Sequence, residues 1–209
     1  MRRFASASRT ITRVPDVRRV LAAALVAWAG AAFGADSIFL VSRKDMPDPN
    51  FHDAVVLVTP VEGAPVGVIL NRPTGIPLAT LLPDVEKNTR PGEKLYFGGP
   101  VSRQMVTFLF KAPKRPPDTI EVLDGVYFAS SRKLLVDILT GETPVDELRV
   151  FAGYAGWTPE QLEGEVSRGD WHVQRSDAKT IFEKNAEKVW PELDRRASRT
   201  PVRFDQERR

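Results

Sequence analysis

Nine short apolar runs, rich in β-branched and aromatic residues, recur along the chain, and turn-forming residues separate them. Runs of this length and composition are typical of β-strands. They lie at 38–42, 54–59, 66–70, 94–97, 106–111, 119–122, 126–129, 148–153 and 171–174. Helical patterns are fewer and do not alternate with the strands. The sequence therefore predicts one domain of the α+β class, with a mixed, largely antiparallel curved sheet flanked by a few helices.

Capping residues locate the helices. Ser131 with Gly141, and Thr158 with Gly169, stand where the N-cap and C-cap of a helix are expected. Gln161 completes a capping box with Thr158, because the two are three residues apart. Two further helices are predicted over 78–82 and 177–188.

Composition excludes several classes of protein. The 209 residues are 42% hydrophobic and 27% charged, as in an ordinary soluble globular protein. The chain contains no cysteine, which excludes a disulfide framework and a thiolate zinc site, and its two histidines are too few for a three-histidine metal site. Phosphate-loop, dinucleotide, zinc-protease and serine-hydrolase motifs are absent. We predict no catalytic residue, no metal and no cofactor.

The start of the chain has the pattern of a secretory signal peptide. An apolar run over 20–33 follows an arginine-rich segment and ends in Ala32-Phe33-Gly34, a small-x-small cleavage pattern. Residues 1–34 are therefore predicted to be a leader, which makes the mature protein exported or periplasmic and leaves it without stable membrane insertion. The alternatives are an uncleaved anchor or a start codon placed too far upstream. Arg18-Arg19 also fits loosely the twin-arginine type of signal.

Charge divides the chain into three parts. Residues 1–34 carry a net charge of +5 and residues 195–209 one of +4, which leaves −6 on the predicted domain, 35–194. An acidic domain lacks the basic face that nucleic-acid binding requires, so no specific nucleic-acid binding is expected. The segment 195–209 has no apolar period and is predicted to be a disordered basic tail.

Three segments are candidates for one binding site. Asn71-Arg72-Pro73, Gly98-Gly99-Pro100 and Gly153 to Trp157 each end or follow a predicted strand, and glycine lets a backbone approach a neighbour closely. We predict that they converge around a shallow concave site, with Arg72 as its polar anchor and Tyr154 as an apolar wall. An ion pair between Arg72 and Glu163 would instead make the cluster structural.

These segments, in this order, resemble the YqgE/AlgH family of bacterial proteins. The resemblance covers about 37–190 and rests on Phe39-Leu40-Val41, Met46-Pro47-Asp48-Pro49-Asn50-Phe51, Gly67-Val68-Ile69-Leu70-Asn71-Arg72-Pro73, Gly98-Gly99-Pro100-Val101 and Gly153-Tyr154-Ala155-Gly156-Trp157. It implies a single compact domain with a barrel-like sheet and no established biochemical activity. Family members usually lack a leader, which implies the alternative of a cytoplasmic protein. Many also carry a histidine where this chain has Lys111.

The sequence thus predicts a non-enzymatic domain that binds a small ligand or a protein. The predicted binding residues are Asn71, Arg72, Gly98, Gly99, Gly153, Tyr154 and Trp157. One alternative is a hydrolase or lyase that uses Asp48, His52 and Glu163, since paired carboxylates and a histidine suit acid–base chemistry. A further alternative is a transcriptional regulator, a role that the family resemblance attaches to some members.

Overall fold

Ten strands form one sheet in the computed structural model, which describes residues 37–61, 64–83, 85, 90, 92–183 and 185–199. The strands are β1 (Ile38–Ser42), β2 (Val55–Val61), β3 (Ala64–Ile69), β4 (Pro73–Pro77), β5 (Lys94–Phe97), β6 (Val101–Lys111), β7 (Ile120–Leu123), β8 (Val126–Ala129), β9 (Glu147–Gly156) and β10 (Trp171–Arg175). The predicted leader lies outside the described residues.

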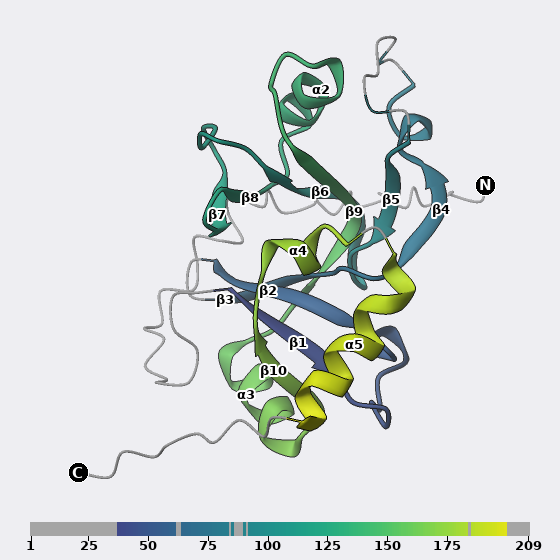
Figure 1. Cartoon of the computed structure of the whole chain (residues 1–209), viewed down its shortest axis with the longest axis vertical. Helices are drawn as coiled ribbons and strands as arrows, with labels where there is room; N and C mark the ends of the chain where they lie inside the picture. Colours follow the sequence, from purple (N-terminus) through teal and green to yellow (C-terminus); the bar gives the residue numbers. More distant parts are fainter. Residues whose placement is uncertain are drawn as a thin grey trace, which may run out of the picture.

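The pairing of the strands is almost entirely antiparallel. Eight strands follow one another in the order β10-β1-β2-β3-β9-β6-β8-β7, while β5 pairs with β4 and with β9. The β5–β9 pair is parallel, and the others are antiparallel. This arrangement is an α+β half-barrel, which confirms the predicted fold class, and Figure 1 shows the sheet curving between its helices.

Alternation along the strands divides the core into an inner and two outer parts. Phe39, Leu57 and Phe151 belong to an inner cluster that α4 and α5 cover. The opposite face packs near α2 through Phe108 and its neighbours, and near α3 through Leu40 and its neighbours. Because successive side chains of a strand point to opposite faces, each central strand contributes to both sides. Figure 1 shows α2 and α3 at opposite ends of the molecule.

The capping signals place two helices as predicted. In α2 (Arg132–Thr140) the Ser131 hydroxyl accepts from the Leu134 amide, and Gly141 ends the helix in a left-handed conformation. In α3 (Pro159–Arg168) Thr158 caps the first turn and Gly169 ends the helix in the same way. The capping box differs from the prediction, because the Gln161 side chain donates to Glu165. The predicted helix over 78–82 is a 3-10 turn, η3 (Leu78–Thr80).

The C-terminal part differs from the prediction of one helix over 177–188. It forms α4 (Ala178–Ile181) and α5 (Ala186–Arg199), separated at Phe182, whose buried ring belongs to the inner cluster. Residues 195–199, predicted to begin a disordered tail, are the last turn and a half of α5. Local sequence could not show this, since α5 gains its stability from burying Ala186, Val189 and Leu193.

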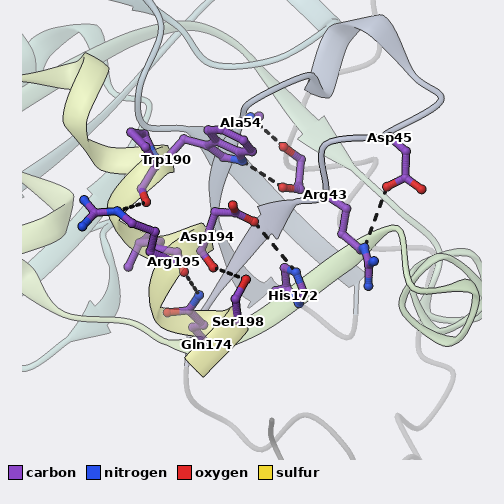
Figure 2. A network of polar contacts seen from close by, with 12 residues as sticks. Arg43, Asp45, Ala54, His172, Gln174, Trp190, Asp194, Arg195 and Ser198 are labelled. Atoms are coloured by element: carbon purple, nitrogen blue, oxygen red, sulfur yellow. Dashed lines mark hydrogen bonds and ion pairs between the residues drawn. The ribbon is translucent and has the colours of Figure 1, made fainter. Parts of the chain in front are cut away.

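Three polar contacts dock α5 on the sheet (Figure 2). The Trp190 indole N–H donates to the Ser42 carbonyl at 2.8 Å, and the Gln174 amide donates to the Leu193 carbonyl at 2.8 Å. His172 on β10 lies 4.0 Å from an Asp194 oxygen on α5. Helix α5 therefore closes the inner face of the half-barrel as part of the domain. Among the described residues, no helix combines the length and apolar character needed to cross a membrane.

Candidate functional site

Strand β9 changes its hydrogen-bonding partner at Gly153. Before this residue, 150–152 pair with β5, and after it, 155–156 pair with β3. Gly153 has φ +73°, a left-handed conformation that interrupts the regular strand. Strands β3 and β5 therefore meet on the same side of β9, where the Ile69 amide donates to the Gly98 carbonyl at 2.9 Å. We call this meeting point the junction.

Glycine is required at the junction because backbones touch there. A Cβ atom on Gly98 would lie 2.3 Å from the Gly153 carbonyl oxygen, and one on Gly99 would lie 2.3 Å from the Tyr154 carbonyl. Contacts this short do not occur with real side chains. The structure thus brings the Gly98 and Gly153 segments together, with another backbone occupying the space that each glycine leaves.

Asn71 and Arg72 hold the turn over 48–53. The Asn71 amide accepts from the Val55 amide and donates to the Asp53 carbonyl, at 2.9 and 2.8 Å. The Arg72 guanidinium donates to the carbonyls of Asn50 and His52, both at 2.5 Å. Burial lowers the pKa of Arg72, while the carboxylates of Asp53 and Asp48 act in the opposite direction. Within the described part of the chain, the hydrogen bonds of the Arg72 guanidinium go to main-chain carbonyls and not to Glu163, the partner of the structural alternative.

The other predicted binding residues pack into the same framework. Tyr154 is half-buried against the inner cluster. Trp157 is buried, and its indole N–H donates to Glu165 at 3.0 Å, as does that of Trp171 at 2.9 Å. The main chain at Arg72 is hydrogen-bonded to the junction as well, because the Phe97 amide donates to the Arg72 carbonyl. The ligand-binding role of the seven residues stays a prediction.

The residues of the predicted hydrolase or lyase are placed differently. Asp48 caps a 3-10 turn by accepting from the Asn50 amide at 2.8 Å. His52 is exposed on that turn, and Glu163 is exposed on α3. Within the part of the chain that the structure describes, no three histidine, aspartate or glutamate side chains are grouped so that they could hold a metal ion.

Arg149 lies in the inner core, at the fork where β3 and β5 separate. It is 4% exposed, and among the described residues it is the one charged side chain that is fully buried. Its guanidinium donates to the carbonyls of Leu70, at 2.9 Å, and Glu183, at 2.5 Å, and stands 4.6 Å above the centre of the Tyr96 ring. Burial lowers the pKa of Arg149, although Tyr96 and nearby glutamates oppose this effect.

A groove of about 520 Å³ lies between the sheet and α4. Lys111 at the end of β6 and Glu147 at the start of β9 form its sheet wall. The other wall comes from α4 and the residues after it, and consists of Ala178, Lys179, Phe182 and Glu183. Arg149 fixes this second wall to the sheet, because it binds the Glu183 carbonyl. The volume falls in the range of about 300–1,000 Å³ that small-molecule sites occupy.

Sequence reasoning missed the groove because its residues come from three separate segments, none of which carries a recognisable motif. One signal was present in the sequence. Arg149 lies among apolar residues of β9, between Leu148 and Val150, and a buried charge marks a place where the fold must supply partners. In the family pattern, Lys111 stands out only as a departure from a histidine.

The strand order, the junction and the helix-covered inner face define this protein as a single-domain α+β half-barrel protein. Residues 39–201 match the model of the AlgH-like family, DUF179, and the chain belongs to this family. The resemblance seen in the sequence motifs is therefore confirmed.

Relatives and solved structures agree with this placement. The chain is 32% identical over 162 residues to a UPF0301 protein of Mycobacteroides abscessus. This alignment covers 75% of this chain and 77% of that protein. It is 34% identical over 158 residues to a UPF0301 protein of Methylococcus capsulatus, covering 74% and 86% of the two chains. The solution structure of the AlgH protein from Pseudomonas aeruginosa matches with a TM-score of 0.64 at 29% identity, over 79% of this chain and 88% of that one.

A second solved structure has a similar fold to this chain. The crystal structure of a Corynebacterium diphtheriae protein matches with a TM-score of 0.64 and 24% identity, over 78% of this chain and 87% of that one. At this identity the match concerns the fold alone. None of these four proteins carries a name that states an activity.

Proposed function

We propose that this protein is a non-enzymatic binding domain, and that the groove between the sheet and α4 takes a small ligand. The observation that carries the proposal is the combination of a ligand-sized hollow with four charged side chains in its lining, Lys111, Glu147, Lys179 and Glu183. A few polar groups around an apolar floor are the usual composition of a small-molecule site, and Ala178 and Phe182 supply the floor here.

The lining supports binding over catalysis. Nucleophilic catalysis by serine, threonine or cysteine places that side chain beside a base, and the described residues that line the groove include none of these types. The predicted acid–base residues Asp48, His52 and Glu163 are absent from the lining as well. In this proposal, the junction and the turn over 48–53 provide the rigid frame, and the groove provides the contacts.

A ligand screen on the full chain, measured by thermal shift, tests this proposal. A ligand that binds the native state raises the melting temperature. We expect a compound that raises it in the wild type and in Lys114→Gln, an exposed lysine outside the groove, but much less in Lys179→Gln. An equal shift in Lys179→Gln, together with loss of the shift in Tyr154→Phe, would place the site at the junction. Absence of any stabilising compound would contradict a small-ligand function.

A specific observation also favours a second candidate, a protein-interaction surface that uses exposed apolar side chains. Of the described residues, three large hydrophobic side chains are more than a third exposed, Ile76 at 43%, Leu81 at 38% and Val101 at 37%. Ile76 lies on β4, Leu81 directly follows η3, and Val101 is the first residue of β6. Exposed apolar side chains suit contact with a protein.

Pull-down from a lysate of the native host tests this second candidate. The double variant Ile76→Glu with Val101→Glu should lose a protein that the wild type recovers in stoichiometric amount. Lys114→Glu is the matched control, because it also adds negative charge at an exposed position. Equal recovery with all three proteins would contradict this surface.

A further inference from the structure

The four charged side chains of the groove form no ion pair with one another. Lys111 and Glu147 are directly opposite in the β6–β9 register, a position that favours a cross-strand ion pair. Lys179 lies on α4, and Glu183 lies two residues beyond the end of this helix. Yet none of the four is in an ion pair with any described residue.

Each wall of the groove carries one charge of each sign. The sheet wall has Lys111 and Glu147, and the α4 wall has Lys179 and Glu183. One Glu183 oxygen accepts from the Asn185 amide at 2.8 Å, a neutral donor that leaves the charge of the carboxylate in place. A ligand with a single charge would therefore attract two of the four groups and repel the other two. A ligand with both charges can satisfy groups of both signs.

The floor between the walls adds a requirement for apolar surface. Phe182 is 9% exposed and belongs to the inner cluster, so its ring offers an edge of the core to the groove. Arg149 keeps this wall in place by binding the Glu183 carbonyl and the Leu70 carbonyl at once. Arg149 is thus a positioning residue, and its guanidinium also attracts the nearby carboxylates of Glu183 and Glu147.

We propose that the groove binds a zwitterionic small molecule with an apolar part, the chemical class of free amino acids with hydrophobic side chains. The ligand ammonium would face Glu147 and Glu183, its carboxylate would face Lys111 and Lys179, and its side chain would lie against Phe182 and Ala178. This inference rests on the proposed function, because it specifies the ligand of the same groove.

Calorimetry on the full chain tests the charge requirement directly. The probes are L-phenylalanine and L-leucine, with phenethylamine as the cation without the carboxylate and 3-phenylpropionate as the anion without the ammonium. We expect at least one amino acid to bind, and both single-charge analogues to bind at least about tenfold more weakly. Equal affinity of an analogue and its parent amino acid would overturn the inference.

Variants show whether the groove is the site. Lys111→Glu and Glu147→Lys each give the sheet wall two like charges and should weaken amino-acid binding about tenfold or more. The double variant exchanges the two charges between opposite positions of the register and should restore most of the affinity. Urea unfolding of all variants separates loss of binding from loss of fold. Unchanged binding in the folded single variants would overturn the inference.

The two proposals can fail separately. If the ligand screen finds a compound whose effect needs Lys179 while neither amino acid binds, the proposed function stands and the zwitterion inference fails. If no compound of any class binds in the groove, both fail.

Discussion

Arg149 brings a charge into the core at a place where the sheet divides. At the end of β3 the Leu70 carbonyl has left the ladder with β9, and the guanidinium supplies the missing donor. The Arg149 guanidinium also donates a hydrogen bond to the Glu183 carbonyl. We expect Arg149→Met, which keeps the apolar stem, to lower the free energy of unfolding by about 1–3 kcal/mol for each carbonyl left without a donor.

Urea unfolding measures this loss, and Arg149→Lys is the control that keeps a charge but has a single donor atom. Stability equal to the wild type in Arg149→Met would mean that burying the guanidinium costs as much as its hydrogen bonds contribute.

Trp157 is a core residue with a polar end. It packs against Phe51, with ring centroids 5.8 Å apart, and shares the Glu165 carboxylate with Trp171. Trp157→Ala should lower the free energy of unfolding by about 3–5 kcal/mol, the range for a large aromatic residue lost from a core. Trp157→Phe should lower it less, because most of the apolar contact remains. A denaturation midpoint unchanged in Trp157→Ala would contradict a structural role.

His172 makes the docking of α5 sensitive to pH. Burial and the positive charge of Arg43 lower the pKa of His172 in the folded protein, and Asp194 opposes them. The unfolded chain, with a histidine pKa of about 6.5, therefore takes up a proton more readily, and stability is lost as the pH falls from about 6.5 through the lower folded pKa.

Urea unfolding at several pH values between about 5 and 8 checks this sign. The wild type should lose stability more steeply than His172→Gln below about pH 6.5. Parallel curves for the two proteins would show that another group is responsible.

Single residues at helix ends were predictable, whereas the partners of Arg72 were not. A cap at Ser131 or Thr158 depends on chemistry within four residues, so the sequence contains all that is needed. The Arg72 guanidinium binds the main chain of a turn about twenty residues earlier. Main-chain carbonyls have no sequence signature, so only the folded backbone reveals them.

At the scale of elements, prediction failed where the residues of a strand are exposed instead of buried. Strand β4 is exposed throughout and carries two prolines and a glycine, and the first four residues of β6 are exposed as well. Prolines are typical of edge strands and are rare in central ones. The sequence of β4 therefore resembles that of a loop. The groove was missed for a related reason, since the spacing of α4 from the sheet is a tertiary property.

The junction between β3, β5 and β9 makes a strong prediction about glycine. Gly98→Ala should prevent the domain from folding, or lower its free energy of unfolding by several kcal/mol, because no room exists between the new methyl group and the Gly153 carbonyl. Gly92→Ala is the matched control, since nothing lies within 4 Å of its Cβ position. Thermal unfolding of the two variants and the wild type tests this prediction by comparing their melting temperatures. Similar stability in both would mean that the strands at the junction can move apart.

For the whole molecule, the start of the sequence makes a prediction about the compartment in which the protein works. We propose that the protein is exported and that its mature form begins near Ala35, as the apolar run over 20–33 indicates. Mass spectrometry of the protein from its native host should find a chain without residues 1–34 in the periplasmic or secreted fraction. An intact N-terminus in the cytoplasmic fraction would contradict export.

The late position of β9 in the sequence determines when the sheet can form during synthesis. Strand β9 pairs with β3, β5 and β6, yet about 50 residues separate it from the end of β5. A ribosome that adds roughly 5–20 residues per second needs about 3–10 s for that interval. Throughout it, the nascent chain presents the unpaired edges of β3 and β5 without the strand that joins them. The half-barrel can close only after synthesis has passed Gly156, so until then the edges of its early strands are open to pairing with other chains.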